Sequence, residues 1–327
     1  WRSSVPLRHR LRGPSMRVRP LAALLSLATV AALALAPTAA AAPPATGSLD
    51  GPPPLCGVWT SRVVASGFAL LENIAALPSG DLLLSEMSAT SLTSSRPDQG
   101  ALWRLTPGGT RHLVTPITSP GGIVVDGNQA YVTFGNSIPS LILNTPTSGI
   151  TRVDLATGQR TTVATGLVMS NGLAALPGGR LLTTGGAGAN DHPTLVEADG
   201  THRPFAPWIT SSNGIARDPK SGDLFIGRSF VHPSEVVRVT ERGELVQRYP
   251  FAGIGPLVGA DDLDLAPDGK LYVAQNSGAR VVQIDPSSGA QCVVADQQWS
   301  ASSIAATDAN TLYATSLLGT VTEYRRG

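Results

Sequence analysis

The segment Asn171-Gly-Leu-Ala-Ala-Leu-Pro-Gly-Gly-Arg-Leu-Leu, residues 171–182, decides the fold because the chain repeats its pattern. A polar residue opens the segment, an apolar run follows, and a Pro/Gly turn leads into a second apolar run. Two short apolar runs around such a turn are typical of paired β-strands. Copies of the pattern, two of them weaker than the rest, begin at Glu72, Gly121, Asn171, Asn213, Asp261 and Ser302.

The spacing of these six starting positions predicts the architecture. They are separated by 49, 50, 42, 48 and 41 residues, and repeats of this length that are built of short strands are typical of β-propellers. Two more strand-like segments follow each hairpin, for example at 149–155 and 160–164. We therefore expect an all-β fold, a six-bladed β-propeller of four-stranded blades. The sixth unit ends one strand early, and residues 58–65 have no blade of their own. This N-terminal strand is predicted to close the ring and to cover a sheet edge.

Composition narrows the class of protein further. The chain has 327 residues, of which 42% are hydrophobic and 14% charged, with 35 Gly and 26 Pro. The apolar fraction is sufficient for a core, and the abundance of turn residues favours many short elements over a helical bundle. Residues 1–42 contain six arginines and no acid, so the remainder has 18 basic and 23 acidic residues. A mildly acidic body without a basic patch makes nucleic acid an unexpected partner.

The amino-terminal segment is predicted to be a signal peptide. Arg17 and Arg19 precede an apolar run at 21–36, and an alanine-rich stretch follows it, which is the order of parts in a secretory signal. The alternative is a membrane anchor, although the run is short for a span. We expect residues 1–41 to hold the signal and the residues upstream of it, 42–57 to be a lead-in, and 58–327 to be the propeller. The mature protein is expected to be secreted, monomeric and free of the membrane.

Cys56 and Cys292 are the only cysteines. In an exported chain, two cysteines most simply form one disulfide. Such a bridge would join the amino-terminal tail to a late strand and lock the closure of the ring. No Cys-x-x-Cys motif is present, which removes the usual redox and zinc arrangements.

The first column of the repeat offers oxygen donors in four units. In a propeller, equivalent positions of successive inner strands converge near the axis, so we expect Glu72, Asn171, Asn213 and Asp261 to meet there. Two carboxylates and two amide carbonyls, without His or Cys, suit a divalent cation, most naturally Ca²⁺. Asn73 and Asp262 stand beside these residues and can join or support the site. The alternative is that each Asn-Gly pair is only a turn and that Asp261-Asp262 is a solvated loop.

At these residues the chain resembles the six-bladed propellers of the gluconolactonase and senescence-marker (regucalcin) family, and those of the related paraoxonases. The resemblance covers about residues 67–316 and is strongest at Ser212-Asn-Gly-Ile and over 260–273. It implies that Glu72, Asn171, Asn213 and Asp261 bind a divalent ion, often calcium. Asn73 and Asp262 match the paraoxonase pattern better, and paraoxonases also join an early cysteine to a late one.

Two positions depart from these families. Gly121 stands where paraoxonases have a proton-transferring histidine, and Met169 stands where gluconolactonases have an arginine. Asn190-Asp191-His192 resembles a paraoxonase active-site loop, although a lone loop histidine is more often merely exposed.

Two classes of function remain open. The first is a metal-dependent hydrolase of a lactone or related ester, in which Asp261 is the general base and His192 a secondary proton-transfer group. The second is a non-catalytic secreted propeller that serves as a binding or scaffold module and holds a structural ion.

Overall fold

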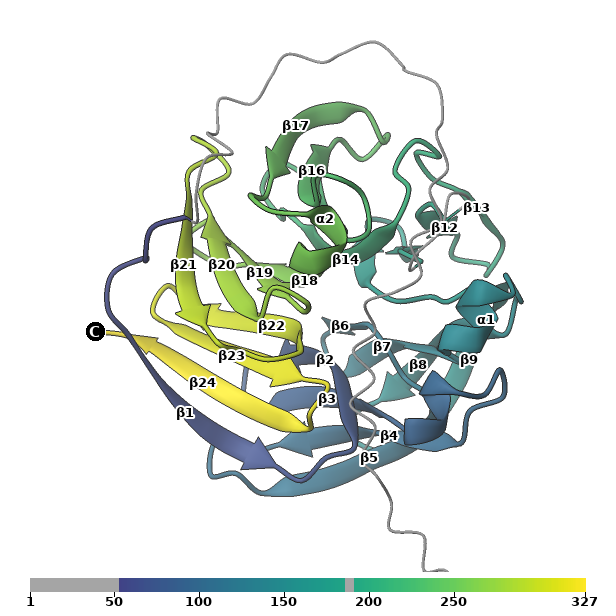
Figure 1. Ribbon diagram of the computed structural model, residues 1–327. Coiled ribbons are helices and arrows are strands. Elements are labelled where there is room, and N and C mark those ends of the chain that lie inside the picture. Colours follow the sequence, from purple (N-terminus) through teal and green to yellow (C-terminus); the bar gives the residue numbers. More distant parts are fainter. Residues whose placement is uncertain (1–52, 186–190) are drawn as a thin grey trace, which may run out of the picture. The chain divides into compact units, whose positions relative to one another are not determined.

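The computed structural model describes residues 53–185 and 191–327. These residues form six four-stranded antiparallel sheets that are arranged as blades around a central channel (Figure 1). The prediction of a six-bladed, all-β propeller is therefore confirmed. The predicted signal peptide at 1–41 and most of the lead-in lie outside the described residues. No helix among the described residues has the length and apolarity needed to cross a membrane.

Each blade uses its strands in the same order from the channel outwards. The inner strands are β2 (Leu70–Ala76), β6 (Ile123–Asp126), β10 (Leu173–Leu176), β14 (Ser212–Arg217), β18 (Ala260–Leu265) and β22 (Ala301–Asp308). The second strands are β3 (Leu82–Met87), β7 (Gln129–Phe134), β11 (Arg180–Thr183), β15 (Leu224–Arg228), β19 (Leu271–Gln275) and β23 (Thr311–Ser316). We number the blades 1 to 6 in this order.

The outer half of each blade completes the sheet. The third strands are β4 (Gln99–Leu105), β8 (Ser148–Asp154), β12 (Thr194–Val196), β16 (Glu235–Val239), β20 (Arg280–Ile284) and β24 (Thr320–Arg326). The outermost strands of blades 1 to 5 are β5 (Arg111–Thr118), β9 (Arg160–Leu167), β13 (His202–Pro204), β17 (Leu245–Pro250) and β21 (Gln291–Asp296). Within the described ranges, three short helices lie in connections between strands: η1 (Ala89–Leu92), α1 (Ile138–Ile142) and α2 (Gly255–Val258).

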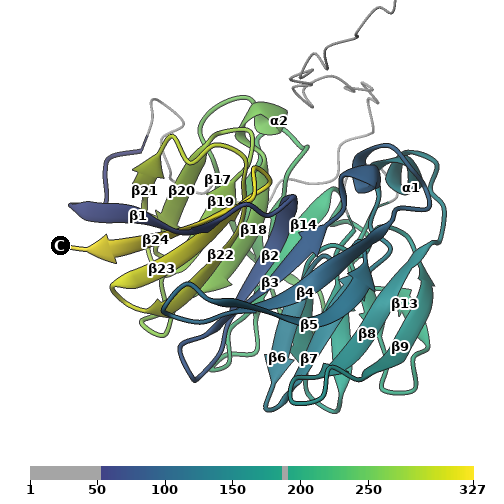
Figure 2. The ribbon, with the colours of Figure 1, turned by 90° about the horizontal axis from the view of Figure 1, so that it is seen from below.

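The sixth blade is completed from the other end of the chain. Strand β1 (Trp59–Ser66) pairs with β24 and forms the outermost strand of that blade (Figure 2), so the predicted closure is confirmed. Just before β1, Leu55 bridges Val293 of β21 in blade 5. Cys56 is joined to Cys292 by a disulfide with a Cα–Cα distance of 5.0 Å. The amino-terminal segment therefore fastens two blades, and the predicted bridge is present.

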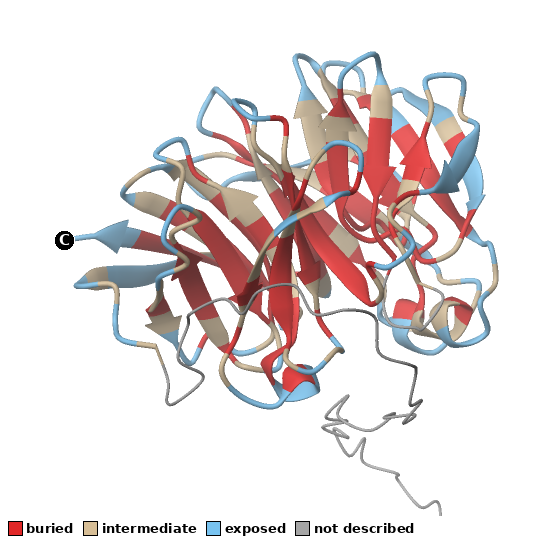
Figure 3. Cartoon of the chain, turned by 90° about the horizontal axis from the view of Figure 1, so that it is seen from above, coloured by how far each residue is buried: buried red, intermediate tan, exposed pale blue. Residues whose placement is uncertain are grey.

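The hydrophobic core lies between blades. Six clusters of buried side chains occur among the described residues, and each contains residues of two neighbouring blades. The second strands are accordingly buried on both faces, as in β19, whose residues are all buried. Figure 3 shows burial along the strands and exposure at the connections. Because each blade packs on both neighbours, the inner strands are held at defined positions around the channel.

Candidate metal centre

The four predicted oxygen donors stand at one end of the channel, where the inner strands begin. We call this end the upper face. In blades 1, 4 and 5 a β-bulge interrupts the inner pairing at the donor: Glu72 lies between Leu71 and Asn73, which both pair with β3. Asn213 and Asp261 lie in equivalent interruptions of β14 and β18. A bulge changes the direction in which a side chain points, and bulges are common beside functional sites. The bulges therefore release these side chains from the strict alternation of a strand.

Interactions between side chains link the four residues. Asn213 Nδ2 donates to Asp261 Oδ1 at 2.6 Å. A hydrogen bond from Asn171 lowers the pKa of Glu72, and the nearby charge of Glu72 raises the pKa of Asp261. The group thus draws on blades 1, 3, 4 and 5, and we call these four residues the oxygen ring. Within the described part of the chain, no three His, Cys, Asp or Glu side chains form a metal-holding group by themselves. A cation here would depend on the two asparagine amides.

Burial raises the pKa values of the carboxylates in this region. Desolvation, followed by repulsion from Asp262, raises the pKa of Glu72 to about 7, against the hydrogen bond from Asn171. Desolvation and the neighbouring charges of Glu72 and Asp262 raise the pKa of Asp261 well above its usual range. Desolvation also raises the pKa of Asp262 to about 7. Glu72 is buried, and Asp261 and Asp262 are half-buried. Three carboxylates in such a setting destabilise one another unless protons or a cation neutralise them.

One amide atom tests whether the oxygen ring fits a cation. The side-chain oxygen of Asn213 is buried and has no hydrogen-bond partner among the described residues. An unpaired buried carbonyl costs free energy, whereas a bound hard cation would use its lone pairs. Carboxylate and amide oxygens are ligands that Ca²⁺ accepts in irregular geometry. The donor set and the unpaired oxygen therefore both fit an oxygen-preferring divalent ion.

Asn73 and Asp262 lie just below the ring and are held by other partners. Asn73 Nδ2 donates to Asp262 Oδ2 at 2.6 Å, and Asn73 Oδ1 accepts from the backbone nitrogen of Ile123 at 3.0 Å. Asp262 Oδ2 also accepts from Ser303 Oγ. Both polar ends of the Asn73 amide are engaged, which suits a residue that supports the site from below and ties blades 1, 2 and 5 together.

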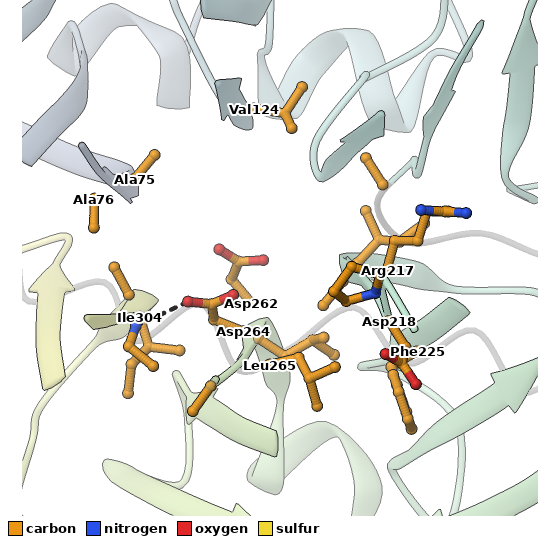
Figure 4. Close-up of a pocket in the computed structure, with 18 of the residues that line it drawn as sticks. Ala75, Ala76, Val124, Arg217, Asp218, Phe225, Asp262, Asp264, Leu265 and Ile304 are labelled. Carbon is orange, nitrogen blue, oxygen red and sulfur yellow. Dashed lines mark hydrogen bonds between the residues drawn. The ribbon is translucent and has the colours of Figure 1, made fainter. Parts of the chain in front are cut away.

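Below this layer the channel widens into a cavity of about 760 Å³. Figure 4 shows Asp262 and Asp264 pointing into it, with Ala75, Val124 and Ile304 on the surrounding walls. Asp264 is anchored by a 2.8 Å hydrogen bond from the backbone nitrogen of Ala306. Asn73 and Asp262, which support the oxygen ring, also line this cavity.

Two further residues of the region were not found by sequence reasoning. Asn276 follows β19 and donates through Nδ2 to Asp261 Oδ2 at 3.0 Å. Asn136 follows β7, and its Nδ2 lies 2.2 Å from where a Cβ on Gly121 would be. Asn136 thus fills the space that a side chain at 121 would need. Both residues follow second strands, so the first column of the repeat contained no signal for them.

His192 is not connected to the ring by any described contact. It lies between β11 and β12, where its Nδ1 is 3.3 Å from the carbonyl oxygen of Pro193. Its role in proton transfer stays a prediction.

Comparison with solved structures agrees with the fold. A gluconolactonase from Xanthomonas campestris superposes with a TM-score of 0.63 at 18% identity, covering 88% of this chain and 98% of that one. An aldose sugar dehydrogenase from Streptomyces coelicolor, in its PQQ-bound form, gives 0.62 at 16% identity and covers 84% and 99%. Virginiamycin B lyase from Staphylococcus aureus gives 0.54 at 11% identity and covers 83% and 99%. These proteins differ in chemistry, so the likeness shows the fold alone.

The sequence itself decides the family. It matches no curated protein. Residues 86–317, which include most of the propeller, match the model of the SMP-30/Gluconolactonase/LRE-like region. The match spans Asn171, Asn213 and Asp261 and begins after Glu72. The chain therefore belongs to the SMP-30/gluconolactonase/LRE-like family.

Proposed function

We propose that this protein hydrolyses a lactone or a related carboxylic ester with the help of a divalent cation held by Glu72, Asn171, Asn213 and Asp261. Calcium is the ion that this donor set fits best. The observation that carries the proposal is the oxygen ring itself, in which four distant residues meet and the amide oxygen of Asn213 is left without a partner. Family membership supports hydrolysis as the reaction.

The residues of the chain suggest how the reaction would be organised. When bound, the cation would polarise the ester carbonyl and stabilise the oxyanion. Asp261 would accept a proton from the attacking water, and its orientation is set by amide donors on both oxygens, from Asn213 and Asn276. Water would add to the carbonyl carbon, the bond to the alkoxy oxygen would break, and that oxygen would take up a proton.

The test uses a panel of lactones and aryl esters, assayed with calcium and again after chelation. We expect turnover that chelation abolishes and calcium restores. Asp261→Asn should lower kcat/KM by a factor of about 100 or more, the range of a general base. Asp264→Asn is the matched control, because this carboxylate lies on the same strand but faces the lower cavity. Turnover that is insensitive to chelation, or equal losses in both variants, would refute the proposal.

A second candidate is a secreted binding or scaffold module with a structural ion. Two substitutions favour this candidate. Gly121 stands where paraoxonases have a histidine, and the buried, uncharged Met169 stands where gluconolactonases have an arginine. Calcium binding without turnover on any ester of the panel would select this candidate. Export through residues 1–41 and a monomeric state belong to both proposals.

A further inference from the structure

Buried hydroxyl groups join neighbouring blades at the level of the oxygen ring. Thr184, which directly follows β11 in blade 3, is the clearest case. Its Oγ1 accepts from the backbone nitrogen of Gly172 at 2.9 Å and donates to the backbone carbonyl of Asn213 in blade 4. Only 1% of Thr184 is exposed. One hydroxyl therefore fixes the backbone of two blades, and one end of the contact is a residue of the ring.

The same kind of contact recurs at the other three ring residues. Thr133 Oγ1 donates to the carbonyl of Asn171 at 3.3 Å. Ser229 Oγ donates to the carbonyl of Ala260, immediately before Asp261. Ser302 Oγ donates to the carbonyl of Leu71, immediately before Glu72, at 2.6 Å. All of these hydroxyls are buried, and each comes from the blade that precedes its acceptor around the ring.

The distribution of these contacts follows the oxygen donors, not the fold. Blades 2 and 6 carry Gly121 and Ser302 in the repeated column, and among residues 53–185 and 191–327 no hydroxyl donates to the carbonyls at 120–121 or 301–302. Hydroxyl groups also contact across the other two junctions, but there they meet side chains: Ser91 Oγ lies 2.6 Å from Ser119 Oγ, and Ser303 Oγ donates to Asp262 Oδ2. The hydroxyl-to-carbonyl contact is made at the four junctions that lead to a ring residue.

We infer that Thr133, Thr184, Ser229 and Ser302 are positioning residues of the metal centre. The physical need arises at the start of the inner strands, where bulges interrupt the regular pairing. A buried carbonyl must be hydrogen-bonded, and a short hydroxyl side chain from the preceding blade donates to it while fixing the backbone that carries the ligand. The Asn171 carbonyl also accepts from the backbone nitrogen of Gly122 at 2.8 Å, so the hydroxyl of Thr133 is its second donor. Groups that orient metal ligands in this way typically change metal affinity by about 10- to 100-fold.

The test measures calcium binding and rests on the proposed metal centre, not on turnover. Thr184→Val keeps the shape of the side chain and removes its hydroxyl, whereas Thr184→Ser retains the hydroxyl. Thr151→Val is the matched control, since Thr151 is also buried but donates to Thr161 in the outer half of blade 2. Calcium titrations by calorimetry are compared with melting temperatures in chelator, and all proteins are the full chain.

We expect Thr184→Val to weaken calcium binding by about 10-fold or more, Thr184→Ser to restore most of it, and Thr151→Val to bind as the wild type does. Comparable melting temperatures of the two valine variants in chelator would separate positioning from general stability. If Thr184→Val does not fold, Ser229→Ala provides the same comparison at Asp261.

Three results would overturn the inference: wild-type affinity in Thr184→Val, an equal loss in Thr151→Val, or no calcium binding by the wild type. Failure of the hydrolase proposal would give a different result. If no ester is turned over but the variants bind calcium in the expected order of affinity, the positioning role stands and the hydrolase proposal fails.

Discussion

Replacing Glu72 by glutamine should stabilise the metal-free protein at alkaline pH. Burial and the charge of Asp262 raise the pKa of Glu72 to about 7, from an ordinary value of 4.5. Between these values the folded protein holds a proton at Glu72 that the unfolded chain has released. The free energy of unfolding therefore falls as the pH rises through this window.

The size of the effect follows from the same two values. Ionising Glu72 in the folded state costs about 3 kcal/mol once the pH exceeds about 8, and nothing below about pH 4. Glutamine keeps an oxygen that can accept from Asn171 but carries no charge. In chelator, Glu72→Gln should therefore unfold with a free energy about 3 kcal/mol above that of the wild type near pH 8, and close to it near pH 4. In calcium, the wild type should have the higher free energy of unfolding, because it binds an ion that the variant binds only weakly.

Urea denaturation followed by tryptophan fluorescence, repeated over this pH range in chelator, measures the difference. Glu86→Gln is the control, because this carboxylate of the same hairpin accepts from the backbone nitrogen of Ala69 and from Trp103 Nε1. Its replacement should lower the free energy of unfolding near pH 8, because it weakens these two hydrogen bonds. A Glu72→Gln variant no more stable than the wild type near pH 8 would mean that the carboxylates of the ring are not buried together, and the reasoning would fail.

Three other changes test the closure, the second blade and the outer sheet. Cys56→Ser opens a loop of 236 residues, which should lower the free energy of unfolding by about 2–5 kcal/mol in urea titrations; a loss below about 1 kcal/mol would contradict this. Gly121→Ala places a Cβ 2.2 Å from Asn136 Nδ2 and should lower the free energy of unfolding by about 1–3 kcal/mol. Thermal melts that coincide with those of the wild type would contradict this. The pKa of Glu323 is lowered to about 2, and a hydrogen bond from Arg325 is the largest cause. Glu323→Gln should therefore lower the free energy of unfolding by about 1–2 kcal/mol at neutral pH, a value discounted because the arginine is exposed. This difference should disappear in denaturation experiments as the pH falls to about 2. A difference that persists there would contradict the assignment.

The candidate site was predictable only where it coincides with the repeat. Glu72, Asn171, Asn213 and Asp261 occupy the repeated position at which a hairpin begins, so spacing alone predicted that they converge. Asn276 was missed because it follows a second strand, where neighbouring residues show no repeated oxygen donor. Its contact with Asp261 depends on the path of β19.

The hydrogen bonds from hydroxyl groups to the neighbouring blade could not be predicted from the sequence either. Serine and threonine are frequent throughout the chain, and no local pattern distinguishes Thr184 from Thr151. What distinguishes them is the acceptor: one donates to a carbonyl of the next blade, the other to a neighbouring strand of its own sheet. Only the packing of blades assigns such partners.

The sequence by itself determined the number of blades, the closure by an amino-terminal strand and the set of ring residues. Period, turn chemistry and an unmatched final unit are properties of the chain read in order, and they suffice for these conclusions. The tertiary structure alone decided which atoms face one another, how deeply the carboxylates are buried and which amide oxygen lacks a partner. Those properties arise when segments about 40 to 50 residues apart are brought together by packing and by bulges, and neither leaves a mark in the local pattern of residues.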